Sequence, residues 1–291
     1  MNRERDMNQQ YITPDMAAYP DSLRDIQNRP TKLYYIGDLS LLSKRCVSVV
    51  GSRTANAYGK STAEAIGRQL GSKGVTVVSG MARGIDTCVH KGALQAGGAT
   101  VAVLGCGLDV CYPPENQKLM DEIASKGLLL SEYPEGTKAE RYHFPVRNRI
   151  ISGLSELTVV VQARNRSGAL ITAELAAEQG REVMAVPGNI DSQYNLGNNK
   201  LISEGVNPLI SVADVLGVLG LNKPDPQEAK RRLSETEYQI FGILEERGEM
   251  SVDEVCMALG KTPAYVNPIL AVMEMKGFIF SAMGKIFLAN V

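Results

Sequence analysis

Short apolar runs alternate with helical patterns through the middle of the chain. The apolar runs are rich in β-branched residues and predict strands over 45–50, 75–79, 99–105, 127–132, 157–163 and 182–188. The segments between them predict helices near 57–72, 86–96, 115–125, 147–153 and 169–179. Strands that are apolar throughout are buried on both faces, and the helices that follow them can cover those faces. The pattern therefore predicts an α/β fold with a doubly wound, mostly parallel sheet over residues 45–221.

Residues on either side of this region have a different pattern. The first 44 residues carry Pro14, Pro20 and Pro30, which predicts an N-terminal arm with short helical pieces. The polar stretch 222–229 contains two prolines and predicts a linker. Residues 230–291 predict a small second domain.

The second domain has the pattern of a winged helix. Helices are expected at 235–247, 252–259 and 263–276, and a hairpin is expected to turn at Met283–Gly284. Three helices followed by a terminal hairpin are typical of winged-helix domains, in which the third helix can read DNA.

Charge separates the two regions. Residues 225–291 hold seven Lys or Arg and ten Asp or Glu, a net charge of −3, which leaves +2 for the rest of the chain. The predicted recognition helix contains neither Lys nor Arg over 263–275. A protein that reads duplex DNA needs basic side chains for phosphates and base edges. This helix is therefore expected to contact protein rather than DNA.

Composition excludes several classes of protein. The chain has 291 residues, is 44% apolar and has a net charge of −1, which is typical of a globular protein and excludes a highly basic protein that coats nucleic acid. The longest apolar runs are strand-sized, so no membrane span is expected, and the polar first residues predict no signal peptide. Five cysteines, an odd number, favour a reducing cytoplasm.

Cys88 and His90, with Cys106 and Cys111 nearby in sequence, are the one arrangement that suggests a metal. Residues two apart on a helix do not share a face, and no two cysteines are separated by two residues. Buried free thiols are the favoured interpretation, and no metal or other cofactor is expected.

Glycine and arginine recur directly after the predicted strands. In a doubly wound sheet these positions share the edge where ligands bind. Glycine lets backbone N–H groups approach an anion, helix N-termini favour negative charge, and arginine suits phosphate oxygens. Such glycines are also common for steric reasons alone, but several of them with arginines on one edge favour a phosphate-binding crevice. The residues concerned are Gly51, Ser52, Arg53, Gly80, Arg83, Gly84, Arg166, Ser167 and Gly168.

The stretch Arg141–Arg149 (RYHFPVRNR) mixes basic and aromatic side chains. It holds three arginines and one histidine, and no acidic residue occurs from Arg141 to Ser155. Basic side chains can contact the phosphates of single-stranded nucleic acid while Tyr142 and Phe144 stack on its bases. The alternative is a solvated basic turn with Phe144 in the core. The arginines favour nucleic-acid binding, whereas the aromatics favour neither interpretation.

Common catalytic and nucleotide-binding motifs are missing from the sequence. No G-x-G-x-x-G follows the first predicted strand, which argues against a nicotinamide cofactor. Gly59-Lys60-Ser61 looks like the end of a P-loop, but position 54 is Thr rather than Gly and the triplet falls within a predicted helix. Glu174 is the one candidate catalytic acid, and the alternative for it is a solvated helix face or an ion pair.

Seven segments together resemble the DprA/Smf family, the DNA-processing proteins of bacterial natural transformation. They keep the family order from about Val47 to Ile210 and read VSVVGSRTANAYG, SGMARGIDTCVHKGAL, VAVLGCGLDVCYPPEN, LLLSEYPEG, FPVRNRIISGLS, SGALITAELA and EVMAVPGNI. The resemblance implies an extended Rossmann-like domain that binds single-stranded DNA. It also implies a homodimer that protects incoming DNA and loads the recombinase RecA onto it, with no enzymatic activity established for the family.

The resemblance also implies roles for individual residues. Gln162 departs from the family, which often has Glu at this strand end, so no role for an acid transfers to that position. The residues that would face DNA are Arg53, Arg83, Arg147, Asn148, Arg149, Arg166 and Ser167, with the glycines of the same turns.

A second function is compatible with a similar core. The LOG-type phosphoribohydrolases process nucleotides and carry P-G-G-x-G-T-x-x-E at the corresponding turn. Here the turn reads RSGALITAE, which keeps a helix N-terminus and a glutamate but lacks the P-G-G-x-G-T loop. The sequence therefore favours the binding protein over the enzyme.

Overall fold

The computed structural model describes residues 10–221, 233–282 and 284–288. The chain divides into two compact units, Met1–Val215 and Leu216–Val291, which are described separately here. The predicted linker 222–229 and Met283 of the predicted turn lie outside the described residues. Among the helices in the described ranges, none is long and apolar enough to cross a membrane.

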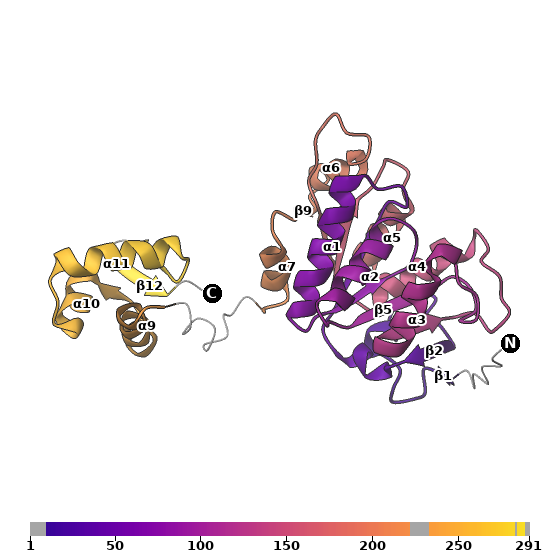
Figure 1. Ribbon diagram of the computed structural model, residues 1–291, viewed down its shortest axis with the longest axis horizontal. Coiled ribbons are helices and arrows are strands. Elements are labelled where there is room, and N and C mark those ends of the chain that lie inside the picture. Colours follow the sequence, from indigo (N-terminus) through magenta and orange to yellow (C-terminus); the bar gives the residue numbers. More distant parts are fainter. Residues whose placement is uncertain (1–9, 222–232, 283, 289–291) are drawn as a thin grey trace. The chain divides into compact units, whose positions relative to one another are not determined.

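The first unit is built on a nine-stranded sheet (Figure 1). The spatial order is β1-β2-β6-β5-β4-β3-β7-β8-β9, and every pair from β6 to β9 is parallel. The strands are β1 (Gln10–Ile12), β2 (Leu33–Gly37), β3 (Cys46–Gly51), β4 (Thr76–Ser79), β5 (Thr100–Leu104), β6 (Leu128–Ser131), β7 (Leu157–Gln162), β8 (Glu182–Ala185) and β9 (Asn207–Pro208). The predicted α/β fold with a mostly parallel sheet is confirmed.

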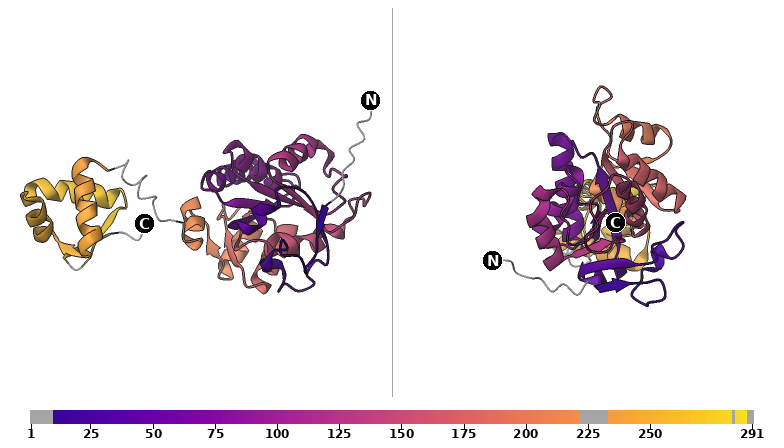
Figure 2. Two further views of the ribbon diagram at one scale, coloured as in Figure 1. Left: turned by 90° about the horizontal axis from the view of Figure 1, so that it is seen from below. Right: turned by 90° about the vertical axis from the view of Figure 1, so that its right-hand side faces the viewer.

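Helices cover both faces of this sheet (Figure 2). The largest helix–helix contacts are between α1 and α2 on one face and between α4 and α5 on the other. The helices are α1 (Ala57–Ser72), α2 (Ile85–Gln95), α3 (Gln117–Lys126), α4 (His143–Gly153), α5 (Gly168–Glu178), α6 (Leu196–Ser203) and α7 (Val212–Val218), with 3-10 turns η1 (Asp21–Leu23), η2 (Leu39–Ser43) and η3 (Pro114–Asn116). The predicted helix over 57–72 has the observed bounds of α1, so the Gly59-Lys60-Ser61 triplet is helical and does not form a P-loop.

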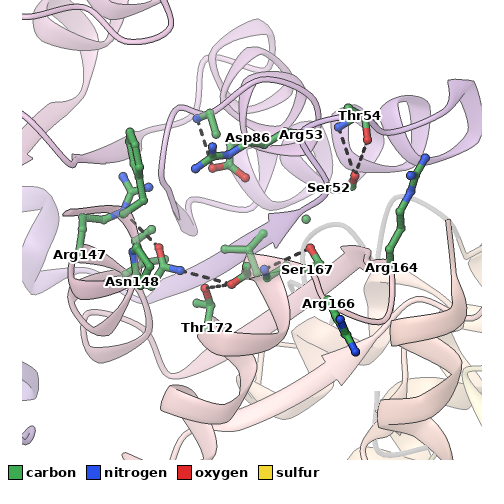
Figure 3. Close-up of a pocket in the computed structure, with 18 of the residues that line it drawn as sticks. Ser52, Arg53, Thr54, Asp86, Arg147, Asn148, Arg164, Arg166, Ser167 and Thr172 are labelled. Atoms are coloured by element: carbon green, nitrogen blue, oxygen red, sulfur yellow. Dashed lines mark hydrogen bonds between the residues drawn. The ribbon is translucent and has the colours of Figure 1, made fainter. Parts of the chain in front are cut away.

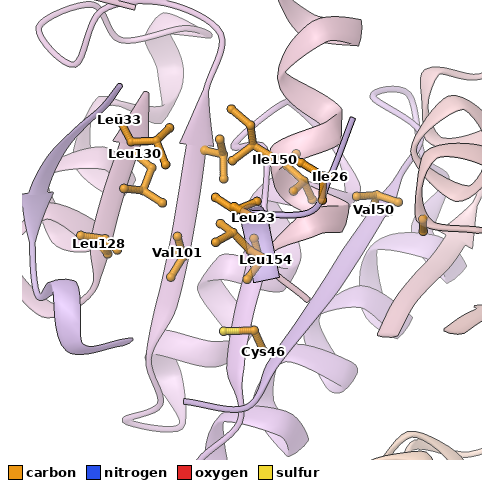
Figure 4. Packing of buried hydrophobic residues seen from close by; sticks show 14 of the residues in the cluster. Leu23, Ile26, Leu33, Cys46, Val50, Val101, Leu128, Leu130, Ile150 and Leu154 are labelled. Carbon is orange, nitrogen blue, oxygen red and sulfur yellow. The ribbon is translucent and has the colours of Figure 1, made fainter. Parts of the chain in front are cut away.

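The buried core explains why the strands are apolar throughout. Successive residues of one strand enter different clusters: Val101 and Val103 of β5 pack with α4, whereas Ala102 and Leu104 pack with α2 and α3. Figure 4 shows Ile150 of α4 and Leu154, which directly follows this helix, packed with residues of the sheet and of the N-terminal segment. A strand that faces helices on both sides has no position for a polar side chain unless a hydrogen bond satisfies it.

The predicted N-terminal arm is part of the first unit. β1 pairs antiparallel with β2, and β2 pairs antiparallel with β6, so this segment extends the sheet beyond its parallel part. Leu23 and Ile26 join the core against α4, and the Tyr19 hydroxyl donates to the Pro30 carbonyl at 2.8 Å. The predicted boundary after residue 44 therefore separates from the sheet a segment that contributes two of its strands.

The sheet changes winding direction between β3 and β7. These neighbouring strands are parallel, and the helices that follow them, α1 and α5, belong to the two helix pairs on opposite faces. The two chain segments therefore diverge at the carboxyl ends of the strands, which is where doubly wound folds bind ligands. A β-bulge between Val50 and Gly51 interrupts the β3–β7 register at this point.

The second unit has the element order of a winged helix. α9 (Glu235–Arg247), α10 (Val252–Leu259) and α11 (Pro263–Met275) are joined by a three-stranded sheet of β10 (Met250–Ser251), β12 (Lys285–Leu288) and β11 (Ile279–Ala282), in that spatial order. Ser234 and Ser251 begin α9 and α10 with capping boxes. The prediction of a small C-terminal winged helix is confirmed.

Candidate nucleic-acid interface

An open cleft of about 580 Å³ lies where β3 and β7 diverge (Figure 3). Its walls come from the loop after β3, from α4 together with Arg141 just before it, and from the loop between β7 and α5. The residues that line it are Val50, Gly51, Ser52, Arg53, Thr54, Ala82, Asp86, Arg141, Phe144, Pro145, Arg147, Asn148, Ile151, Arg164, Arg166, Ser167, Gly168, Ala169 and Thr172.

Four exposed arginines line this cleft: Arg53, Arg141, Arg164 and Arg166. Within the ranges that the structure describes, none of the four forms an ion pair with a carboxylate. The Arg53 guanidinium lies over the Phe144 ring, 4.8 Å from its centroid, and that of Arg164 lies 4.7 Å from the Tyr194 centroid. Such stacking orients an arginine and leaves its N–H donors available to an anion.

The N-terminus of α5 points into the same cleft. Ser167 caps the helix, since its hydroxyl accepts from the backbone N–H of Ala169 at 3.3 Å. The Gly168 carbonyl accepts from Asn148 Nδ2 and from Thr172 Oγ1, both at 3.3 Å, which fixes the turn against α4. A helix N-terminus carries partial positive charge and suits an anion, as the Gly168 turn predicts from sequence.

Backbone hydrogen bonds hold the loop after β3 in place. Ser52 donates from its backbone N–H to the Gln162 carbonyl at 2.7 Å, and its own carbonyl accepts from Ile85 at 3.3 Å. The second bond brings α2 so close that a Cβ on Gly84, which has φ +78°, would lie 2.2 Å from the Ser52 oxygen. Gly84 is therefore needed for packing behind the cleft and does not line it.

Arg147 is buried, with only 4% of its surface exposed. Its guanidinium donates to the Gly80 carbonyl at 3.0 Å and to the Val103 carbonyl. A Cβ on Gly80 would lie 2.4 Å from Nη2 of Arg147, so Gly80 makes room for this side chain. Arg147 therefore lines the cleft as a buried residue whose guanidinium is held by backbone carbonyls, and its contact with phosphates stays a prediction.

Asp86 is the buried carboxylate whose charge acts most strongly on Arg147. It accepts from the backbone N–H groups of Gly80 and Ala82 at 3.2 and 3.3 Å. Burial raises the pKa of Asp86, and the charge of Arg147 with these N–H groups opposes that rise. Burial lowers the pKa of Arg147 to about 10, and the negative charge of Asp86 opposes this decrease. The arginine therefore stays charged at neutral pH.

Arg149 does not line the cleft. Its guanidinium forms a bidentate pair with Glu132, at 2.7 and 2.9 Å, and donates to the Asn28 carbonyl at 2.8 Å. α4 begins at His143, four residues before its predicted start, with Pro145 tolerated in the first turn. Residues two apart on a helix do not share a face, so Arg147 and Arg149 lie on different sides of α4.

Arg83 also lies outside the cleft. It pairs through Nη2 with Glu115 at 3.0 Å, and both side chains are more than half exposed. Of the twelve residues that the sequence predicts, the cleft contains eight, namely Gly51, Ser52, Arg53, Arg147, Asn148, Arg166, Ser167 and Gly168, and omits Gly80, Arg83, Gly84 and Arg149.

Arg141 and Arg164 are cleft residues that the predicted site omits. Arg141 stands three residues before the segment that resembles the family, and Arg164 stands two residues after the end of β7, at the edge where a ligand is expected. Gln162, the departure from the family, is fully buried: its side chain accepts from the Asn56 N–H and donates to Asn56 Oδ1 and Asn195 Oδ1 at 3.1–3.2 Å. A neutral amide here joins the start of α1 to the loop before α6.

The cysteines and His90 do not form a metal site among the described residues, where no group of three or more potential ligands comes together. All five cysteines are free, and burial raises the pKa of Cys106 to about 11. His90 is buried beside Thr100, with 2.6 Å between Nδ1 and the hydroxyl, and burial lowers its pKa to about 3.

Comparison with known proteins agrees with this geometry. The family model described as DNA recombination-mediator protein A matches residues 10–220, which is most of the chain. The chain belongs to this family. The DNA processing protein DprA of Bacillus subtilis is 46% identical over 68% of this chain and 67% of its own length. Protein Smf of Synechocystis is 42% identical over 76% of this chain, but the match spans only 56% of that protein.

Two solved structures of family members share the fold. The crystal structure of DprA from Streptococcus pneumoniae is 43% identical and superimposes with a TM-score of 0.70 over 72% of this chain and 74% of that one. The structure of DNA processing protein A from Helicobacter pylori is 30% identical, with a TM-score of 0.66 over 73% and 96%. The latter is described as having a unique single-stranded DNA binding mode.

We expect Arg147→Ala to destabilise the first unit by about 3–5 kcal/mol, since it leaves the buried Asp86 without its countercharge. Urea denaturation followed by circular dichroism would measure the loss. Arg45→Ala is the control, because Arg45 pairs with Glu156 at the surface, where a pair contributes at most about 1 kcal/mol. Equal stability of the two variants would show that Arg147 is not structural.

Proposed function

We propose that the cleft binds the phosphates of single-stranded DNA. The observation that carries this proposal is the set of four exposed arginines around the N-terminus of α5, for which the described part of the chain offers no carboxylate partner. An unpaired guanidinium can exchange its hydration for a phosphate at little cost, whereas Arg149 would have to leave Glu132. Arg53, Arg141, Arg164, Arg166, Ser167 and Gly168 are the proposed contacts.

Two features favour a single strand over a duplex. Phe144 lines the cleft and Tyr142 is 68% exposed beside it, so aromatic rings are available to unpaired bases. α11, the helix that would enter a major groove, has no Lys or Arg and exposes Tyr265, Val272 and Met275. The binding mode described for the Helicobacter pylori relative supports the same class of ligand.

The proposed cellular role follows from the family. We infer a recombination mediator that protects incoming single-stranded DNA during natural transformation and loads RecA onto it, acting in the cytoplasm as a homodimer. The family description supports the mediator role. The acidic winged helix would then contact protein, since its exposed α11 face is uncharged apart from Glu274.

The alternative of a LOG-like phosphoribohydrolase is less well supported. Hydrolysis would need a carboxylate that reaches a ligand, and Asp86, the one carboxylate among the described residues that line the cleft, is committed to two backbone N–H groups. Glu174, the candidate acid from sequence, does not line the cleft. We therefore propose that the chain binds DNA and does not act as an enzyme.

The first test compares oligo-dT with a hairpin of the same length by gel shift. We expect oligo-dT to bind far more tightly, because the cleft can receive one flexible backbone and no basic helix is present to enter a groove. Equal affinity for the two probes would contradict the proposal, as would release of free base from a nucleoside monophosphate.

The second test separates phosphate contacts from scaffold by salt dependence. Each phosphate contact on a single strand contributes about 0.7 to the slope of log affinity against log salt. Arg53→Ala, Arg141→Ala, Arg164→Ala and Arg166→Ala should each flatten the slope by about that amount, equally for oligo-dT and mixed sequences. Arg45→Ala is the control and should leave the slope unchanged. An unchanged slope in all four folded variants would exclude this cleft.

The third test removes the winged helix by ending the chain after Leu221. The cores of the two units are separate clusters, and residues 225–291 carry a net charge of −3. We expect the shortened protein to keep its circular dichroism spectrum and its affinity for oligo-dT within about tenfold, or 1.4 kcal/mol. A larger loss in a folded protein would place DNA contacts in the second unit.

A further inference from the structure

We infer that the path of the strand leaves the arginine cleft across Tyr112, which provides a second base-stacking position beside Arg83. This inference rests on the proposed function and adds a subsite to it. Tyr112 is 42% exposed and does not line the cleft. It comes from the loop after β5, in a segment to which no function has been assigned above.

Three side chains form a continuous row from the cleft to this tyrosine. Arg53 lies over the Phe144 ring at 4.8 Å, and the Phe144 and Tyr112 centroids are 5.3 Å apart with their planes tilted by 34°. Phe144 is partly buried against Gly105, where an added Cβ would lie 3.0 Å from the ring. The row is therefore fixed at Phe144 and ends in the exposed ring of Tyr112.

An exposed tyrosine at the end of such a row suits an unpaired base. Stacking on a ring is tolerant of base identity, because every base has a π-face. A phosphate held by Arg53 would leave the adjoining base close to Phe144, and the next nucleotide would reach Tyr112. The row thus extends binding by about one nucleotide beyond the cleft.

Arg83 supplies a cation for the phosphate that accompanies this base. Glu115 stands three residues after Tyr112 in the chain and pairs with Arg83, so Arg83 lies beside the segment that carries Tyr112. The Arg83–Glu115 pair is exposed on both sides, so a phosphate can compete for the guanidinium. Arg83 is therefore still expected to contact DNA, but at a site outside the cleft.

An abasic scan tests the stacking position. Wild-type protein is titrated with a series of oligo-dT probes, each carrying one abasic nucleotide at a different position, and the scan is repeated with Tyr112→Ala. In the wild type, the abasic nucleotide that faces Tyr112 should weaken binding about tenfold. In Tyr112→Ala the intact probe should bind about tenfold more weakly, and the penalty at that one position should disappear while the penalties elsewhere remain.

Tyr112→Phe and Tyr265→Ala are the matched variants. Phenylalanine keeps the ring, so Tyr112→Phe should restore both the affinity and the positional penalty. Tyr265 is similarly exposed, at 47%, but lies on α11, and its replacement should change neither. An unchanged scan in folded Tyr112→Ala would overturn the inference, as would a loss that Tyr112→Phe does not restore.

Charge removal provides an independent measurement of the same path. Glu115→Gln should strengthen binding to oligo-dT about threefold, because it removes a negative charge beside the strand and releases Arg83. Glu122→Gln removes the same charge from α3, where Glu122 pairs with Lys126, and should have no effect. Equal affinities of the two variants would contradict a path past Arg83.

These outcomes are distinguishable from failure of the proposed function. If the wild type binds oligo-dT and the four cleft arginine variants flatten the salt slope, the cleft is supported whatever Tyr112 does. If the wild type does not prefer oligo-dT to a hairpin, the proposed function fails first and the subsite fails with it.

Discussion

The cleft depends on the pairing of β3 with β7 at the centre of the sheet. These strands run parallel, yet the chain leaves them toward opposite faces, so the two segments diverge at the carboxyl ends. The Ser52 N–H and the Gln162 carbonyl tie the two ends together at 2.7 Å, beside a β-bulge. The same backbone that forms the core therefore fixes the positions of the loop after β3 and of the N-terminus of α5.

Burial decides which arginines are available to an anion. Arg147 supports the floor through the carbonyls of Gly80 and Val103, and Arg149 joins α4 to the N-terminal segment through Glu132 and Asn28. Both charges are neutralised or hydrogen-bonded inside the protein. Arg53 and Arg164 instead stack on aromatic rings, which costs them none of their N–H donors. The basic stretch 141–149 therefore contributes both arginines with internal contacts and an exposed arginine that lines the cleft.

The sequence predicts the parallel core well because most of its strands are apolar runs that alternate with helical patterns. It does not predict that β1 and β2 join the sheet, since β1 pairs only with β2, and β2 pairs with β6, which is remote in sequence. The sequence predicts which loops form the site, because the carboxyl ends of parallel strands lie at one edge of the sheet. The sequence does not reveal that Arg147 and Arg149 make internal contacts, because their hydrogen-bond partners lie on other segments of the fold.

A crystal structure of the full chain with oligo-dT bound is the most direct test of the central claim, that this cleft holds the phosphates of a single strand. We expect a phosphate within hydrogen-bond distance of the Arg53 guanidinium and another beside the N-terminus of α5 near Ser167, with Arg147 and Arg149 still in their internal contacts. A strand bound elsewhere with the cleft unoccupied, or an Arg149 that has left Glu132 to reach a phosphate, would contradict it.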